Sequence, residues 1–222
     1  MTGVPRASGT GRLISAVAWT VLLLALWLWG RELTDGGPPL GTPGEAPAAG
    51  RAGEGATPPA PAEPLAGHPA PRVVEIEAIG VRADIVARDV DASGGVAPPP
   101  FETPEVVGWY AGGPTPGAAG AAVLVGHVDT ETEPAVFYAL SDVPPGSEVR
   151  VTRTDGSVAE FTVSDVEVVE RGEFDATRVY GPRRAGAAEL RLITCGGTFD
   201  RERQSYSANV VVSAYLTHAA AA

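Results

Sequence analysis

The sequence predicts a mainly β domain with at most short helices, built from about 145 residues that begin near Pro71. Short runs rich in valine alternate between apolar and polar residues there, as strands with one buried face do. Turn signals such as Asp155-Gly156 and Pro145-Gly146 separate these runs, and no long helical apolar stripe is present. Regularly spaced short strands of this kind indicate a closed β-barrel or a β-sandwich.

The first element is an apolar segment, Leu13–Gly30, which contains no charged residue. As a helix it would be about 27 Å long, close to the thickness of the hydrocarbon layer of a membrane. Basic residues precede it and acids soon follow it, so the positive-inside rule puts residues 1–12 in the cytoplasm and the rest of the chain outside. The alternative is a cleaved signal peptide, but Arg31-Glu32-Leu33 offers no small-residue cleavage site. We therefore expect an uncleaved transmembrane signal anchor over residues 13–30.

Residues 31–70 are rich in proline, glycine and alanine and show no apolar periodicity. Such a segment buries too little apolar surface to offset the entropy of ordering it. We expect a disordered linker that holds the following domain away from the membrane.

The predicted domain covers residues 71–217, and residues 218–222 form a short tail. One stretch, Ala135–Leu140, is long enough for one or two helical turns. A β-hairpin with an Asp-Gly turn is expected around residues 155 and 156. The predicted strands are Val73–Ile79, Ala121–Val125, Glu148–Thr152, Ala159–Val163, Val166–Val169, Glu189–Thr194 and Asn209–Ala214.

Composition excludes several classes of function. The net charge of −11 argues against nucleic-acid binding, which needs a basic surface. A single cysteine excludes an intramolecular disulfide framework and a cysteine-rich zinc site, and three histidines leave little material for a metal centre. We expect neither a metal nor another cofactor.

Two predicted strands end in residues that could carry chemistry. His127 follows the strand Ala121–Val125 after one glycine, and Cys195 follows the strand Glu189–Thr194 and precedes two glycines. A cysteine nucleophile needs a partner that exchanges protons with it, and these two residues are the one such pair in the predicted domain. The alternatives are an inert buried cysteine, or one that pairs with another chain.

An arginine could stabilise the thiolate or the negative charge that develops on a substrate carbonyl oxygen. Arg203 and Arg201 follow Cys195 in the next loop; Arg203, which is nearer the last strand, is the first candidate for this role, and Arg201 is the alternative. An ion-pair cluster on the surface would explain both equally well. Thr194 and the backbone amides after it could donate hydrogen bonds to an oxyanion.

These motifs resemble those of the sortases, and more closely the class F sortases of high-GC Gram-positive bacteria. The resemblance rests on a Thr-Cys pair that ends the last-but-one strand, an upstream His that ends an apolar strand, and a membrane anchor ahead of both. It covers nearly all of residues 71–216, and includes the stretches IEAIGV (76–81), GWY (108–110), AVLVGHVD (122–129), AVF (135–137) and LRLITCGGTFD (190–200).

The resemblance implies an eight-stranded β-barrel and a cysteine transpeptidase. Cys195 would attack the Thr–Gly bond of an LPXTG-like sorting signal on a surface protein. An amine of a peptidoglycan precursor would then resolve the thioacyl enzyme, with His127 moving protons and Thr194 shaping the oxyanion region. One departure concerns the arginine, because many sortases carry it just before the apolar run of the last strand, where this chain has Asn209.

Two other functions remain possible on the sequence. One is a different extracytoplasmic cysteine enzyme, such as a peptidase or an L,D-transpeptidase-like cross-linker. The residues Leu-Ile-Thr before Cys195 disfavour the latter, which would have a small-residue loop there. The other is a membrane-tethered binding module with an inert cysteine.

Overall fold

The structure, a computed structural model, describes residues 58–92 and 94–220. The predicted cytoplasmic segment 1–12, the predicted membrane span 13–30 and most of the predicted linker lie outside the described residues. Within the described ranges, no helix is both long enough and apolar enough to cross a membrane.

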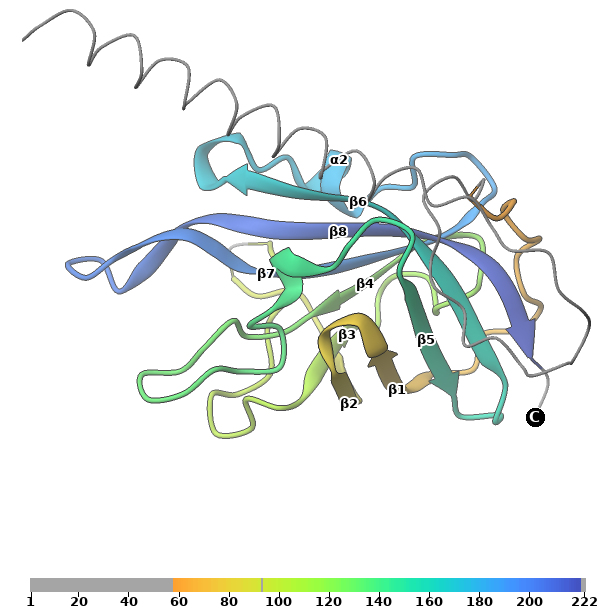
Figure 1. The fold of residues 1–222 in the computed structure, drawn as a ribbon, viewed down its shortest axis with the longest axis horizontal. Coiled ribbons are helices and arrows are strands. Elements are labelled where there is room, and N and C mark those ends of the chain that lie inside the picture. Colours follow the sequence, from red (N-terminus) through yellow and green to blue (C-terminus); the bar gives the residue numbers. More distant parts are fainter. Residues whose placement is uncertain (1–57, 93, 221–222) are drawn as a thin grey trace, which may run out of the picture. The chain divides into compact units, whose positions relative to one another are not determined.

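Eight strands form a closed barrel in the order β1-β2-β3-β4-β7-β8-β6-β5 (Figure 1). Two neighbouring pairs, β2 with β3 and β4 with β7, are parallel, and the other neighbours are antiparallel. Of the two topologies that strand spacing allowed, the barrel is therefore the correct one. The strands are β1 (Pro71–Ile76), β2 (Val81–Arg88), β3 (Val107–Tyr110), β4 (Gly120–Val125), β5 (Glu148–Arg153), β6 (Val158–Glu170), β7 (Ala188–Asp200) and β8 (Ser205–Ala220).

Alternation predicted six of these strands but missed two. The predicted runs 159–163 and 166–169 are one continuous strand, β6, and the predicted strand Val73–Ile79 ends early at Ile76. The sequence did not predict β2, because its buried and exposed residues do not alternate cleanly, or β3, because it has only four residues. Both are held by their neighbours, since β3 pairs in parallel with β2 and antiparallel with β4.

The helical elements are all short. They are the 3-10 turns η1 (Glu77–Ile79), η2 (Leu140–Asp142) and η3 (Arg171–Glu173) and the helix α2 (Ala176–Tyr180). The helix begins after Asp175, whose carboxylate accepts hydrogen bonds from the amides of Thr177 and Arg178 and so caps its N-terminus. The stretch 135–140 forms turns that lead into η2, which agrees with the one or two turns expected there.

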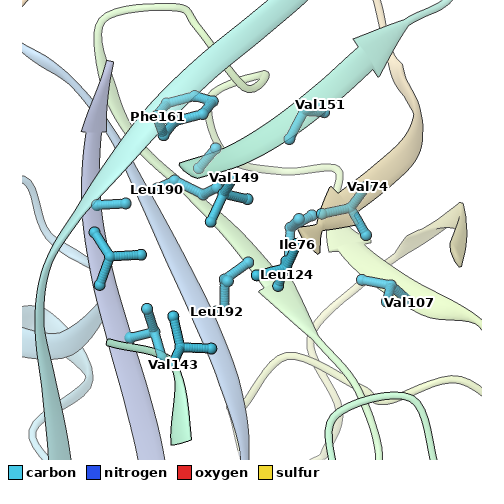
Figure 2. Packing of buried hydrophobic residues seen from close by; sticks show 14 of the residues in the cluster. Val74, Ile76, Val107, Leu124, Val143, Val149, Val151, Phe161, Leu190 and Leu192 are labelled. Atoms are coloured by element: carbon cyan, nitrogen blue, oxygen red, sulfur yellow. The ribbon is translucent and has the colours of Figure 1, made fainter. Parts of the chain in front are cut away.

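The barrel interior is filled by apolar side chains from every strand. Figure 2 shows residues from several strands converging, among them Phe161, Leu190 and Leu124, all completely buried. Burial of such side chains supplies the main favourable free energy of folding.

A second apolar cluster covers the outer face of the sheet formed by β4, β7, β8 and β6. We call it the outer cluster. Because side chains alternate between the two faces of a strand, it identifies which residues of these four strands face outward. Its buried members are Val96, Val123, Val125, Val169, Val179, Ile193 and Val211.

The described end of the predicted linker, residues 58–70, lacks regular secondary structure but packs on the barrel. The amide of Ala62 donates to the carbonyl of Leu216 at 2.8 Å, and the amide of Leu65 donates to the carbonyl of Gly117 at 2.8 Å. Both side chains pack against the interior cluster, so these apolar residues belong to the folded domain. At the other end, β8 runs to Ala220 and pairs with the start of β6, so most of the expected tail is strand.

Candidate active site

The parallel pairing of β4 with β7 brings His127 and Cys195 together. Val125 is paired with Ile193, and the amide of Gly126 donates to the carbonyl of Ile193 at 3.1 Å. β4 ends at Val125, and His127 follows it by two residues, whereas Cys195 lies two residues after Ile193 inside β7, which runs on to Asp200. The prediction that Cys195 follows the end of its strand is therefore wrong, but the pairing brings together the two segments that carry these residues, 68 positions apart in the chain (195 − 127).

Strand alternation also fixes the faces on which the site residues lie. Ile193 belongs to the outer cluster, so Cys195, two residues on, lies on the outer face. Thr194 pairs with Val210, a member of the interior cluster, and so lies on the opposite face from Cys195. Its hydroxyl is buried and has no hydrogen-bond partner among the described residues. Its side chain therefore lies on the opposite face from Cys195, whereas the donor role expected for it requires it to face the reacting groups.

His127 is held under the loop between β2 and β3. Its ring is only 7% exposed and stacks on Phe101, with ring centroids 4.1 Å apart. The Nε2 atom lies 2.7 Å from the carbonyl oxygen of Pro99. A carbonyl oxygen can only accept, so Nε2 carries the proton and Nδ1 is the basic nitrogen of the neutral ring.

Cys195 is half-buried, and burial raises the pKa of its thiol. The carboxylate of Asp129 raises this pKa further, whereas the guanidinium of Arg171 lowers it. The thiol is therefore mainly protonated at neutral pH, and its activation depends on the charges around it. No hydrogen bond joins it to His127 among the residues that the structure describes.

A carboxylate and a phenol form a linked pair near the thiol. The hydroxyl of Tyr206, on β8, donates a hydrogen bond to Asp129, two residues after His127. This hydrogen bond, together with burial and the nearby Asp129 charge, raises the pKa of Tyr206 to about 12. The pair connects the chain after β4 with the β7–β8 hairpin.

Gly197 allows β8 to lie very close to the backbone of β7. Gly197 has φ of +76°, and a Cβ there would lie 2.4 Å from Oγ of Ser207. Thus Gly197 combines a left-handed backbone with a contact that no side chain allows.

The two predicted arginines lie away from the thiol. Arg201 and Arg203 are in the turn at the tip of the β7–β8 hairpin, which projects well beyond the short strands (Figure 1). The side chain of Arg203 is 82% exposed and forms an ion pair with Asp200 at 3.1 Å. The arginine whose charge acts on Cys195 is instead Arg171, just after β6. Sequence inspection missed it because only the pairing of β6 with β8 brings it near.

A buried ion pair anchors the loop that leads from α2 into β7. Glu189 and Arg191 have side chains only 5% and 1% exposed, and they are 2.5 Å apart. The Glu189 carboxylate also accepts from the amides of Arg183 and Arg184, and Arg191 donates to the carbonyl of Gly181 at 3.0 Å. The loop is thus tied to the strand that carries Cys195.

This arrangement supports nucleophilic acyl substitution, since a thiol can attack a carbonyl carbon while an imidazole moves protons. Among residues 58–92 and 94–220, no group of three His, Cys, Asp or Glu residues is arranged to hold a metal ion.

Comparison with known proteins points to one family. The sequence profile of the Sortase domain matches residues 74–217. Sortase A from Corynebacterium diphtheriae, in a lid mutant, has a TM-score of 0.51 at 20% identity, over 69% of this chain and 73% of that one. Sortase C-1 from Actinomyces oris has a TM-score of 0.50 at 22% identity, over 66% and 73%. Sortase A from Listeria monocytogenes has a TM-score of 0.50 at 15% identity, over 69% and 90%. Curated protein sequences gave no match.

Proposed function

Because this chain belongs to the sortase family, whose members are cysteine transpeptidases, we propose that it cleaves an LPXTG-like sorting signal and transfers the new C-terminus to an amine of the cell wall. The nucleophile is Cys195, and His127 is the group that exchanges protons with the substrates. The observation that supports this proposal is the β4–β7 register, which pairs Val125 with Ile193 and so brings the segments that carry His127 and Cys195 together.

In the first half-reaction, the sulfur of Cys195 attacks the carbonyl carbon of the Thr–Gly bond. The carbonyl oxygen becomes an oxyanion, and the thiol proton passes to His127. The tetrahedral intermediate collapses with rupture of the C–N bond, and His127 gives the proton to the departing glycine amine. The products are a thioester on Cys195 and a free amine.

In the second half-reaction, an uncharged primary amine attacks the thioester carbonyl. His127 accepts a proton from this amine, and the C–S bond breaks. The proton returns to the departing sulfur, so the thiol is regenerated and a new amide is formed. Each half-reaction is thus an acyl transfer in which atoms and protons balance.

The alternatives make different products. A cysteine peptidase would release a free carboxylic acid whether or not an amine is present, and an inert cysteine would give no product at all. The half-buried but accessible position of Cys195 on the outer face favours a reactive thiol over one sealed in the interior.

The test combines a fluorogenic LPXTG peptide with a primary-amine acceptor and the full-length protein in a mild detergent. We expect an amide product, identified by mass spectrometry, that depends on the amine. Cys195→Ala should abolish turnover, and His127→Ala should reduce it severely while thermal unfolding stays near wild type. Turnover that survives Cys195→Ala, or free acid as the sole product in excess amine, refutes the proposal.

We also propose that residues 13–30 anchor the protein in the cell membrane with the barrel outside, and that its relatives are the class F sortases. The support for the location is the charge pattern around an uncharged apolar segment. Protease added to intact cells should remove the barrel and leave a short N-terminal fragment in the membrane fraction. A barrel that resists the protease until the cells are lysed contradicts this location.

A further inference from the structure

The candidate site has no positively charged residue at the position on β8 where many sortases carry an arginine. Asn209 of β8 is paired directly with Cys195 of β7. Asparagine carries no charge, so it cannot provide the electrostatic stabilisation that an arginine gives to a thiolate or an oxyanion. A charge for this purpose has to come from another element.

The next strand in the barrel, β6, continues this row of paired residues. Val169 of β6 is paired with Asn209, so Val169, Asn209 and Cys195 lie side by side on three adjacent strands. Val169 belongs to the outer cluster and so faces the same side as Cys195. Glu170, the last residue of β6, is paired with Ala208, and Arg171 follows it as the first residue of the 3-10 turn η3, so Arg171 lies just past the end of β6, two residues from this row. The β6 and β7 backbones are about 10 Å apart across β8, and a long arginine side chain can cover much of that gap.

The guanidinium of Arg171 is also available. It is exposed, and no ion pair or hydrogen bond engages it among the described residues. By contrast, Arg203 is paired with Asp200, and the side chain of Arg183 is paired with Asp165. The electrostatics agree with this placement, since Arg171 is the basic group that lowers the pKa of Cys195.

We propose that Arg171 is the arginine of this active site, supplied from the end of β6 in place of the residue that β8 lacks at Asn209. Its guanidinium donates hydrogen bonds to the carbonyl oxygen of the scissile bond and stabilises the negative charge that develops there during both half-reactions. This assignment rests on the proposed acyl transfer at Cys195. It replaces the sequence-based candidates Arg203 and Arg201.

Other titratable groups also act on Cys195 and belong in the interpretation of any pH profile. Asp129 raises the pKa of the thiol, and Tyr206, hydrogen-bonded to Asp129, lies within electrostatic range. His127, which follows β4, is the third titratable group in this part of the barrel. A variant of Arg171 therefore needs a matched arginine control that leaves all three groups in place.

The test compares Arg171→Ala and Arg171→Lys with two controls, Arg203→Ala and Arg178→Ala, in the full-length protein. Arg178 is exposed on α2 and has no side-chain partner among the described contacts. We expect Arg171→Ala to lower kcat/KM for peptide and amine by about 10²–10³-fold, the usual effect of losing an oxyanion donor. Lysine should retain part of the activity, added guanidinium salt should partly restore the alanine variant, and both controls should resemble wild type.

A second readout needs no peptide. The rate of alkylation of Cys195 by iodoacetamide follows the thiolate, so its pH profile should move to higher pH in Arg171→Ala and stay in place in both controls. Wild-type turnover by Arg171→Ala, or loss of turnover in Arg203→Ala alone, overturns the assignment. If the wild-type protein processes no sorting peptide, the transpeptidase proposal fails, and the alkylation profile still decides whether Arg171 acts on the thiol. Should Arg171→Ala fail to fold, Arg171→Lys and Arg171→Gln give the same comparison.

Discussion

The buried ion pair of Glu189 and Arg191 gives a stability prediction whose size follows from the structure. Arg191→Met keeps an apolar stem of similar length but removes the guanidinium. It leaves the Glu189 carboxylate, 5% exposed, with only the amides of Arg183 and Arg184 as partners. Removing one partner of a buried pair typically costs about 3–5 kcal/mol in the free energy of unfolding, because the other charge remains buried.

The pair also makes stability depend on pH in a defined direction. Burial alone would raise the pKa of Glu189, but the Arg183 amide, the Arg191 guanidinium and the Arg184 amide together hold it below its ordinary value. A carboxyl with a lowered folded-state pKa stabilises the protein above its unfolded-state pKa, and this stabilisation is lost as the pH falls through the folded-state value. In Arg191→Met the pKa of Glu189 rises, so the acid loss of stability should begin at a higher pH.

Urea unfolding of the full-length protein, followed by tryptophan fluorescence between neutral and acid pH, measures both effects. Arg183→Met is the matched control, because it removes a partly exposed ion pair with Asp165 but keeps the backbone amide that binds Glu189. Such a pair contributes about 0–1 kcal/mol. Equal losses in the two variants, or a loss below about 1 kcal/mol in Arg191→Met, would falsify the reasoning.

Three further predictions concern the site. Asp129→Asn should move the pH profile of cysteine alkylation to lower pH, because it removes a charge that raises the pKa of the thiol; an unchanged profile contradicts this. Gly197→Ala should cost about 1–3 kcal/mol in urea unfolding through steric overlap at a left-handed backbone, whereas Gly172→Ala, which meets no atom within 4 Å, should change little. Phe101→Ala should speed modification of His127 by diethylpyrocarbonate, because the 65% exposed Phe101 ring covers the 7% exposed imidazole; an unchanged rate means that the rest of the loop provides the cover.

Local patterns predicted most of the sheet. The strands β4 and β7 and the middle of β8 contain runs rich in apolar and β-branched residues, buried on both faces, and the sequence predicts them without knowledge of their neighbours. The strands β2 and β3 were missed, since a short or weakly alternating strand is held by pairing with its neighbours rather than by its own pattern.

The residues of the candidate site also differ in how well the sequence alone predicts them. Cys195 and His127 stand out because each comes directly after an apolar run in the sequence, which is a local feature. The arginine prediction put Arg203 first because it lies nearer the last strand, with Arg201 as the alternative, but both lie in the turn of the β7–β8 hairpin, where Arg203 is exposed and paired with Asp200. The side chain of Thr194 likewise lies on the face opposite Cys195, because its neighbour in the strand already occupies the outer face.

The sequence alone determined which residue types could carry chemistry and where most strands lie, because apolar runs and turn residues are encoded over a few neighbouring positions. Only the tertiary structure decided that β4 lies parallel to β7 and that β8 lies between β7 and β6. Those pairings join segments far apart in the chain, and they depend on closing the barrel around a shared interior rather than on any local pattern. They bring the segments that carry His127 and Cys195 together, and they place Arg171 just past the end of the β6 segment that pairs with β8.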